Sequence, residues 1–301
     1  MSSGRRSPAS CQPSTAINIP KGTDPRIMGR LKTTNTPELA VLLSLGMDRN
    51  PLTLAVEQAL MRGRDWSAAV PEQIAVRIAG LITVDMIHAG QRLLEKDISE
   101  VLQVSRAPVR EALRILEREG LIEFRARRGA IVTSPDAQEL RDIYVVRDTL
   151  FGILLHQLME ERPEDLDALF EQHVPGLVRA VEESVDAYTS ASFLMGMAMA
   201  DLSSNRLVAD LLNSISLRTL RYVRLGMVAN PALMESSVRT SRAMHRAVSR
   251  RDTDLVLSTA KKRIGSSREA AIEALSPVSA KEKGAPGRSS APRAVAALAI
   301  C

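Results

Sequence analysis

Arginines recur every four residues between Ser105 and Gly120, at positions 106, 110, 114 and 118. A spacing of four residues places side chains on one face of an α-helix. Another face of the same helix carries an apolar stripe that can pack on a core: Val109, Ala112, Leu113 and Leu116. A guanidinium group near the start of such a helix can donate two hydrogen bonds to O6 and N7 of guanine. The pattern therefore favours a helix that enters the major groove of DNA.

The same arginines have a less specific explanation, because exposed charge rows on helices commonly pair with nearby carboxylates. Glu111, Glu117 and Glu119 are close enough along the chain to serve as partners. From Ser105 to Gly129 there are seven arginines and four glutamates, so the local excess is 7 − 4, or three positive charges. This excess is modest, and it does not by itself separate a solvated helix face from a DNA-binding face.

Three helices and a hairpin are predicted around the arginine row. From Pro71, apolar residues recur at the spacing of an amphipathic helix: Ile74, Ile78, Leu81 and Ile82. A second helix is expected over 95–102, and Ser105 is a good N-cap for a third helix that has Pro108 in its first turn. Apolar runs at 121–124 and 130–133 bracket a basic tip with Gly129, which is typical of a β-hairpin. Together these elements predict a winged helix-turn-helix over residues 71–135.

The remaining chain divides by composition. With 301 residues there is room for two domains, and the 3% of aromatic residues favours helices packed through aliphatic side chains. Helices are expected over 136–160, 164–184, 187–203, 205–228, 231–250 and 252–275. The predicted fold class is mainly α, an N-terminal winged helix-turn-helix followed by an all-α helical bundle over 136–275. We expect a disordered basic arm over 1–35, a short helical extension of unassigned role over 36–70 and a disordered tail over 276–301.

Net charge and cysteine content place only weak limits on the class of protein. The net charge of +5 fits a polyanionic partner, although much of the excess lies in the predicted arm and tail. Cys11 and Cys301 are the two cysteines and lie in these same segments, so no disulfide framework or thiolate metal site is indicated. No segment has the apolar length of a signal peptide or a spanning helix, so we expect a cytoplasmic protein without membrane contact.

The run from Ser105 to Leu113 reads Ser-Arg-Ala-Pro-Val-Arg-Glu-Ala-Leu and is followed by Leu116, Glu117, Gly120 and Leu121. This run closely resembles the DNA-binding domain of the GntR family of transcription regulators. The resemblance implies that Lys96, Ser105, Arg106, Arg110 and Gly129 fall on positions that contact DNA. Two more residues complete the candidate set, Ala107 in the first turn of the helix and Arg128 at the basic tip, which can approach a phosphate or the minor groove.

Four residues depart from the pattern of that family. Gln103 stands where glycine is usual in the turn, Asp85 and Ala89 replace a glycine and a proline, and Ala107 replaces a threonine. If Gln103 is held at positive φ, the strain is about 1 kcal/mol, which the turn should survive.

The start of the second domain, from Arg141 to Arg147, resembles the FCD domain that follows the winged helix in one GntR subfamily, and Ser204 to Leu207 and Arg251-Asp252 resemble later landmarks of that domain. The resemblance implies an effector-binding bundle that also dimerises. Many FCD domains hold a metal with one aspartate and three histidines, and those positions fall here on Ser192, Gly196, Ser241 and Arg263. None of these is a good ligand, and His245 alone does not make a site, so we expect no metal and no other cofactor.

An arginine at one of these positions suggests a different ligand. The guanidinium groups of Arg263 and Arg147 can bind a carboxylate effector, with Ser192 and Ser241 as further candidate contacts. The alternatives are that either arginine pairs with Asp201 or Asp210 or faces solvent, or that ligand sensing has been lost. Met195, Met197 and Met199 are interpreted as flexible core filling.

Two functions are consistent with these patterns. The first is a dimeric regulator that binds a palindromic double-stranded operator and responds to a small molecule, with repression as the more common outcome in the family. The second is a DNA-binding protein without an effector and with weak sequence preference, aided by its basic arm. An enzyme is not indicated, because the sequence has no nucleophile elbow, phosphate loop or Cys/His pair at catalytic spacing.

Overall fold

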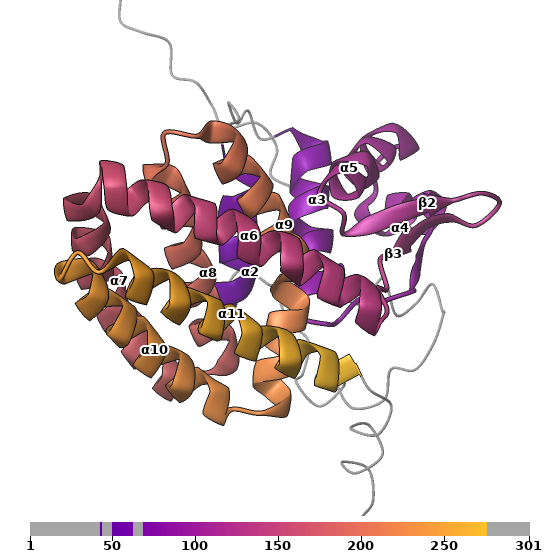
Figure 1. Ribbon diagram of the computed structural model, residues 1–301. Helices are drawn as coiled ribbons and strands as arrows, with labels where there is room; N and C mark the ends of the chain where they lie inside the picture. The colour runs from indigo at the N-terminus through magenta and orange to yellow at the C-terminus, as the bar shows by residue number, and fades with distance from the viewer. Residues whose placement is uncertain (1–42, 44–49, 63–68, 276–301) are drawn as a thin grey trace, which may run out of the picture.

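A computed structural model of the chain describes residues 43, 50–62 and 69–275. The predicted arm over 1–35 and tail over 276–301 lie outside these residues, as does most of the predicted extension over 36–70. The described residues form two packed units, an N-terminal unit drawn in purple and a C-terminal unit of long helices (Figure 1). The mainly α fold class expected from the sequence is confirmed.

The N-terminal unit is a winged helix. Its helices are α3 (Val70–Thr83), α4 (Glu95–Leu102) and α5 (Arg106–Arg118). The strands of the wing, β2 (Ile122–Arg125) and β3 (Gly129–Val132), pair antiparallel within one residue of the predicted runs. A two-residue strand that the pattern did not predict, β1 (Arg92–Leu93), pairs with the other edge of β3, so the sheet order is β1-β3-β2. The sheet therefore ties the segment before α4 to the wing.

The C-terminal unit is a bundle of six helices. They are α6 (Ala137–Glu161), α7 (Pro163–Glu183), α8 (Val185–Leu202), α9 (Arg206–Ala229), α10 (Ala232–Ser249) and α11 (Thr253–Leu275). Each end lies within two residues of its predicted place, because polar caps and prolines mark the boundaries. Asp136, for example, forms a reciprocal capping box with Glu139 at the start of α6. No helix in the described ranges has the length and apolar character needed to cross a bilayer.

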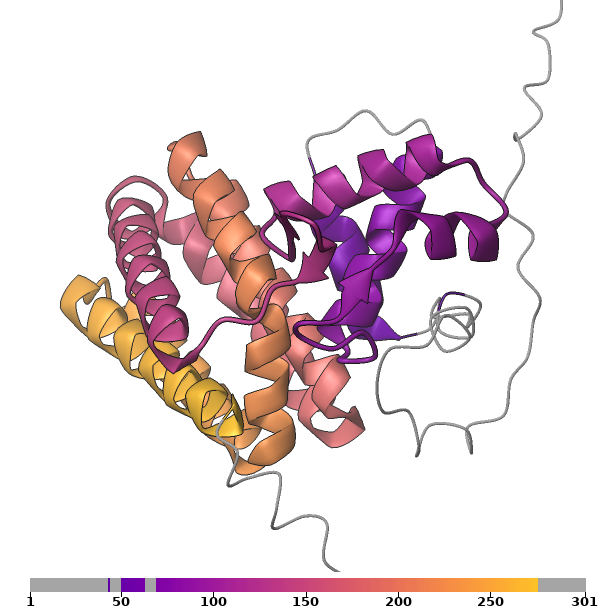
Figure 2. The same cartoon turned by 90° about the vertical axis from the view of Figure 1, so that its right-hand side faces the viewer.

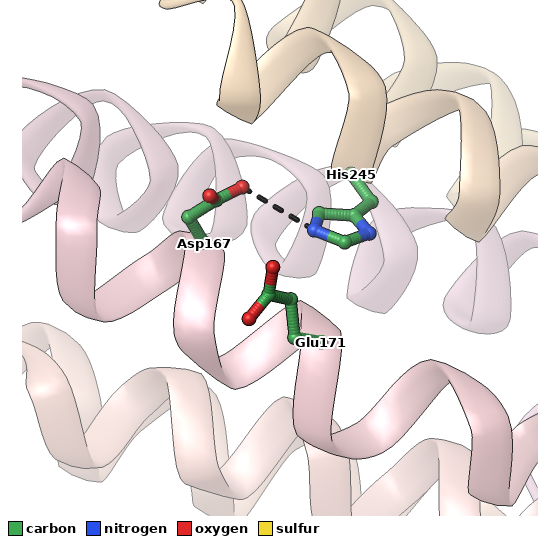
Figure 3. A group of neighbouring side chains, drawn as sticks. All are labelled: Asp167, Glu171 and His245. Carbon is green, nitrogen blue, oxygen red and sulfur yellow. Dashed lines mark ion pairs between the residues drawn. The ribbon is translucent and has the colours of Figure 1, made fainter.

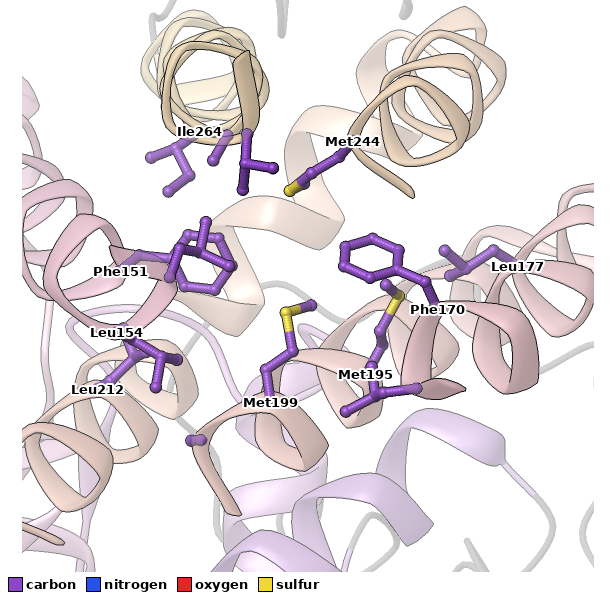
Figure 4. Close-up of a cluster of buried hydrophobic side chains, with 14 of the residues drawn as sticks. Phe151, Leu154, Phe170, Leu177, Met195, Met199, Leu212, Met244 and Ile264 are labelled. Atoms are coloured by element: carbon purple, nitrogen blue, oxygen red, sulfur yellow. The ribbon is translucent and has the colours of Figure 1, made fainter. Parts of the chain in front are cut away.

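The interior of the bundle is filled mainly by aliphatic, methionine and phenylalanine side chains. Figure 4 shows Met195 and Met199 of α8 pointing into this core, with Phe151 of α6 and Phe170 of α7 on either side. Both methionines are 1% exposed. The interpretation of this methionine-rich stretch as core filling is confirmed for all three residues, because Met197 is buried in the second apolar cluster, which includes the winged helix.

A further helix, α2 (Pro51–Met61), fills the space between the two units. It packs against α3 on one side and α8 on the other. Asn50 accepts hydrogen bonds from the first turn of α2 and donates to Asp186 Oδ2 at 2.8 Å, while Arg224 Nε donates to Asp186 Oδ1 at 2.6 Å. These contacts give the extension, which had no assigned role in the sequence analysis, a place between the two units.

The winged helix and the bundle share one buried apolar cluster. Phe193 and Met197 of α8 and Leu217 and Leu220 of α9 pack among the core residues of α2, α3 and α5. In Figure 2, α8 and α9 lie next to the purple unit, whereas α6 and α11 lie on the far side of the bundle. The winged helix therefore completes its core with side chains from the second unit.

An ion pair also joins the winged helix to the bundle. Asp85, the residue that replaces a glycine of the family pattern, has a φ of +63° and pairs with Arg221 of α9. The Arg221 side chain is 10% exposed, and its Nε and Nη1 have no hydrogen-bond partner among the described residues. Asp85 thus supplies the carboxylate that compensates a nearly buried positive charge.

We predict that Asp85→Asn destabilises the full-length chain by about 2 kcal/mol, because it leaves the buried Arg221 charge without a carboxylate. Asparagine tolerates positive φ as well as aspartate does, so backbone strain stays constant in this comparison. Equilibrium unfolding in urea measures the change. Asp165→Asn is the matched control, because its pair with Arg162 is 44% to 51% exposed and should be worth less than about 1 kcal/mol. Equal effects of the two substitutions would contradict a structural role for the Asp85 pair.

Candidate functional site

The turn between α4 and α5 leaves the start of α5 exposed to solvent. Gln103 has a φ of +53°, so it does occupy the left-handed region that favours glycine, and the Val104 N–H donates to Ser99 O at 3.1 Å. Ser105 then takes the extended N-cap conformation, but its hydroxyl makes no capping hydrogen bond to the helix. The prediction of Ser105 as the N-cap is thus right for the backbone and wrong for the side chain, and Ser105 is exposed.

The predicted DNA contacts of the first turn form one exposed surface. Lys96, Ser105, Arg106, Ala107 and Arg110 are all exposed. Lys96 lies in the first turn of α4, the other four lie at the start of α5, and the two helices are in contact, with Glu95 bonded to Arg110. Arg106 makes no ion pair with any described residue, so its guanidinium keeps its donors for a ligand.

Arg110 is held in place by Glu95 of α4. Its Nε and Nη2 donate to the two carboxylate oxygens at 3.0 Å and 2.8 Å. This hydrogen bond lowers the pKa of the Glu95 carboxyl and raises the pKa of the Arg110 guanidinium. The pair orients Arg110 and also places one negative charge beside the basic surface, a feature that sequence spacing did not show.

The tip of the wing adds a second basic element. Arg127 has a φ of +62° and Gly129 a φ of +75°, and the Arg128 N–H donates to Arg125 O at 3.0 Å. A Cβ atom at Gly129 would meet nothing within 4 Å, so glycine is favoured here by its backbone conformation and not by crowding. Arg127 and Arg128 are exposed and make no ion pair with other described residues.

A second candidate site is a cavity of about 90 Å³ in the helical bundle, lined by residues of α6, α8, α9, α10 and α11. Its wall combines apolar side chains of phenylalanine, leucine, isoleucine, valine and methionine with a similar number of serines and threonines. Two positively charged side chains reach it, Arg147 from α6 and Arg263 from α11. No described residue of the wall carries a carboxylate or an imidazole. A small molecule with an apolar part and an anionic group would therefore find a matching surface for each in this cavity.

The two arginines are positioned by neighbouring side chains. Arg263 donates from Nη2 to Ser192 Oγ at 2.6 Å and from Nε to Ser237 Oγ at 2.9 Å, and Arg147 lies over the ring of Tyr144 at 5.6 Å. Burial lowers the pKa of Arg147, and the nearby charge of Arg263 lowers it further. Neither arginine pairs with a carboxylate in the described part of the chain, so the predicted alternative of an ion pair with Asp201 or Asp210 is wrong.

Ser241 is not part of the cavity, contrary to the prediction. Its side chain is fully buried, and its hydroxyl donates to Ser237 O at 2.9 Å within the same helix. Ser237 and Thr240 line the cavity instead. The error is about one helical turn, because family landmarks far along the chain fix the register of α10 poorly.

The cavity does not suit the metal that many FCD domains hold. Of the four positions, Ser192, Gly196 and Arg263 line the cavity, and none offers an imidazole or a carboxylate. The Arg263 guanidinium bridges the hydroxyls of Ser192 and Ser237, so a positive charge already lies among these positions. The polar residues present therefore supply positive charge and hydroxyl groups and no metal ligand set.

The cavity also touches the shared core. Phe193 and Leu220 line it and belong at the same time to the buried cluster that completes the winged helix. A pattern of apolar residues could not reveal this double role, because it does not say which neighbour each face meets.

Comparisons with known proteins agree with this arrangement. The model for bacterial regulatory proteins of the gntR family matches residues 71–132, and the FCD domain model matches residues 142–264. Both matches fall inside the ranges predicted for the two domains, and α2 precedes both of them.

Two curated relatives are similar over parts of their length. The uncharacterized HTH-type transcriptional regulator YdhC of Bacillus subtilis (strain 168) is 26% identical over 129 residues, which cover 42% of this chain and 58% of that protein. The gluconate operon transcriptional repressor of the same organism is 34% identical over 108 residues, covering 35% of this chain and 44% of that protein. The chain thus spans about half the length of these two relatives.

Two solved structures share the fold. A putative transcriptional regulator GntR from Rhodococcus sp. RHA1 has a TM-score of 0.53 at 20% identity and covers 68% of this chain and 99% of its own. The E. coli protein McbR/YncC has a TM-score of 0.56 at 19% identity, with 66% and 94% covered. The winged helix, the helical bundle and the two family matches show that this chain belongs to the gntR family of bacterial regulatory proteins and that its second domain is an FCD domain.

Proposed function

We propose that this regulator binds a palindromic operator as a homodimer, acts as a repressor, and changes its DNA affinity when a small carboxylate enters the FCD cavity. The observation that carries the DNA part is the exposed surface of Lys96, Ser105, Arg106, Ala107 and Arg110 at the start of α5. The similarity to a protein named as a gluconate operon repressor supports repression as the outcome.

The residues of this surface take different roles in the proposal. Arg106 reads a base in the major groove, because it lies in the first turn of α5 without an ion-pair partner among the described residues. Ser105 and Arg110 flank it, with Arg110 oriented by Glu95. Lys96, Arg128 and the backbone at Gly129 contact phosphates, which sets affinity but not sequence preference.

A dimer follows from the geometry of this class of domain, since two recognition helices one helical turn of DNA apart read an inverted repeat. Exposed apolar side chains on the outer face of α6 support a contact between two copies. Val145, Val146 and Ile153 are 56%, 50% and 42% exposed.

The effector part of the proposal rests on the two arginines. Arg263 and Arg147 have no carboxylate partner in the described part of the chain, and they line a cavity whose wall combines apolar side chains with serines and threonines. A carboxylate can accept paired hydrogen bonds from a guanidinium, which makes it the best-matched anion. Occupation would press on Phe193 and Leu220, which also belong to the core of the winged helix.

A second candidate function is DNA binding that does not depend on an effector and has weak sequence preference. It is favoured by the absence of any metal-ligating residue from the described wall of the cavity, which is consistent with lost ligand sensing. The two functions differ in whether a short inverted repeat is preferred over random DNA.

Arg106→Ala should weaken binding to the specific sequence by about 1–3 kcal/mol and relax the preference at one base pair. Lys96→Ala should weaken binding to all sequences alike, because it removes a phosphate contact. Fluorescence anisotropy on specific and random duplexes measures both. Arg118→Ala is the matched control, since this exposed arginine lies 12 residues further along α5, about 18 Å along the axis. Equal losses of Arg106→Ala on both duplexes would rule out base reading by Arg106.

Selection of bound sequences from a random DNA pool by the full-length protein tests the operator. We expect enrichment of a short inverted repeat whose half-sites are spaced for two recognition helices. Titration of the winning sequence at two salt concentrations then separates phosphate contacts from base contacts. Enrichment of no motif, together with a steep salt dependence, would favour the second candidate function.

A panel of small mono- and dicarboxylates should contain compounds that raise the melting temperature of the wild-type protein. Arg147→Met should abolish that shift while the unliganded domain stays folded, because Arg147 donates to the ligand in this proposal. Arg141→Met, an exposed arginine on the same helix, is the control and should leave the shift intact. A ligand-induced shift that persists in Arg147→Met would remove this residue from the site.

A further inference from the structure

Three potential metal ligands meet between α7 and α10, away from both the DNA-binding surface and the cavity. Asp167 and Glu171 are four residues apart and share one face of α7, and His245 faces them from α10 (Figure 3). One ligand atom from each of the three side chains lies within 4.8 Å of the other two. We propose that Asp167, Glu171 and His245 bind a divalent transition-metal ion that clamps α7 to α10.

The histidine is held in an orientation that suits a ligand. Its ring stacks on Phe170 of α7, with centroids 5.6 Å apart and 9° between the planes. Nε2 is shielded from solvent and lies 3.3 Å from Asp167 Oδ1, yet it makes no hydrogen bond to any described residue. This imidazole nitrogen is buried, faces two carboxylates and has no hydrogen bond, so its bonding capacity is unsatisfied. A bound cation would satisfy it.

The aspartate is supported by a neighbour, as metal-binding carboxylates usually are. Ser249 Oγ donates to Asp167 Oδ1 at 2.6 Å and therefore fixes the rotation of the carboxylate. Glu171 is exposed and has room to rotate. Ligand atoms at about 2.0–2.2 Å from a zinc ion lie at most about 4.4 Å from one another, so a small rotation of Glu171 closes the set.

The donor set identifies the class of ion. One imidazole nitrogen and two carboxylate oxygens suit zinc and manganese, and they suit calcium or magnesium less because those ions prefer oxygen ligands only. With a neutral imidazole, the two carboxylates supply two negative charges for a divalent ion. An ion pair between protonated His245 and Asp167 would explain their contact, but it would give Glu171 no role.

This site is separate from the positions where FCD domains hold their metal. Three of those four positions line the cavity, where the guanidinium of Arg263 disfavours a cation, and the expectation of no metal was based on the four. His245 lies about two turns beyond Ser237 on α10, the helix that also contributes to the cavity wall. An ion here would fix α10 against α7 without touching the effector.

Zinc titration of the full-length, chelator-treated protein tests the proposal, with binding measured by competition against a chromophoric chelator. We expect wild type to bind zinc, and to melt at a higher temperature when zinc is present. His245→Gln and Glu171→Gln should each lose at least about tenfold in zinc affinity, and Ser249→Ala about tenfold. His156→Gln is the matched control, because His156 also contacts a carboxylate, Glu160 at 3.3 Å, but has no third ligand nearby among the described residues.

The variants distinguish a metal site from a salt bridge. If His245→Gln fails to fold, Glu171→Gln decides the question, because Glu171 is exposed and has no structural hydrogen bond among the described residues. Zinc affinity in Glu171→Gln equal to that of wild type, or no zinc binding by wild type, would overturn the proposal. Equal zinc affinity in wild type and His156→Gln, with loss in the other variants, would establish it.

Discussion

The buried apolar cluster shared by the winged helix and the helical bundle is the constraint on which the other features depend. Helices α2 and α3 present faces that are covered by Phe193, Met197, Leu217 and Leu220 of the bundle. Each of these four side chains is at most 7% exposed. Because burial of apolar surface contributes about 25 cal/mol per Å², this contact stabilises the orientation of the two units, and the Asp85 pair seals its edge.

In our proposal the shared core connects the cavity to the winged helix. Phe193 and Leu220 each have one side against the cavity and the other among residues of the winged helix. Close-packed interiors transmit strain, so a ligand that moves these side chains also shifts the support of α3 and α5. Helix α2, which precedes both family matches, adds its own side chains to this shared cluster and packs against α3 and α8.

Much of the fold could be predicted because the signals are local. The apolar stripe and N-terminal turn of α5, the basic tip of the wing and the caps of the six bundle helices all appear within a few consecutive residues. The replacement of a glycine by Gln103 in a known turn raised the question of positive φ, which the structure answers with a φ of +53°. The surface of Lys96, Ser105, Arg106, Ala107, Arg110, Arg128 and Gly129 is exposed as such signals imply, and its contact with DNA stays a prediction.

What could not be predicted depends on contacts between distant segments. Strand β1 has two residues and exists only because β3 offers an edge. Arg110 and Glu95 pair across a turn, and the spacing of residues in the sequence does not define the geometry of that turn. Ser241 was placed in the cavity because the register of α10 was predicted about one turn off. In the sequence, Asp85 was recognised only as a departure from a family pattern. Its ion pair could not be predicted because the partner, Arg221, lies 136 residues away.

The operator affinity of Gly196→Leu, in the absence of any ligand, tests the coupling between cavity and DNA most directly. A Cβ atom at Gly196 would meet nothing within 4 Å, so the new side chain can occupy the cavity as an effector would. We expect the affinity to change at least about fivefold relative to wild type, the lower end of typical allosteric coupling. Gly176→Leu, at a helical glycine of α7 with equal room, should leave it unchanged. An operator affinity of Gly196→Leu equal to that of Gly176→Leu and wild type would contradict the coupling.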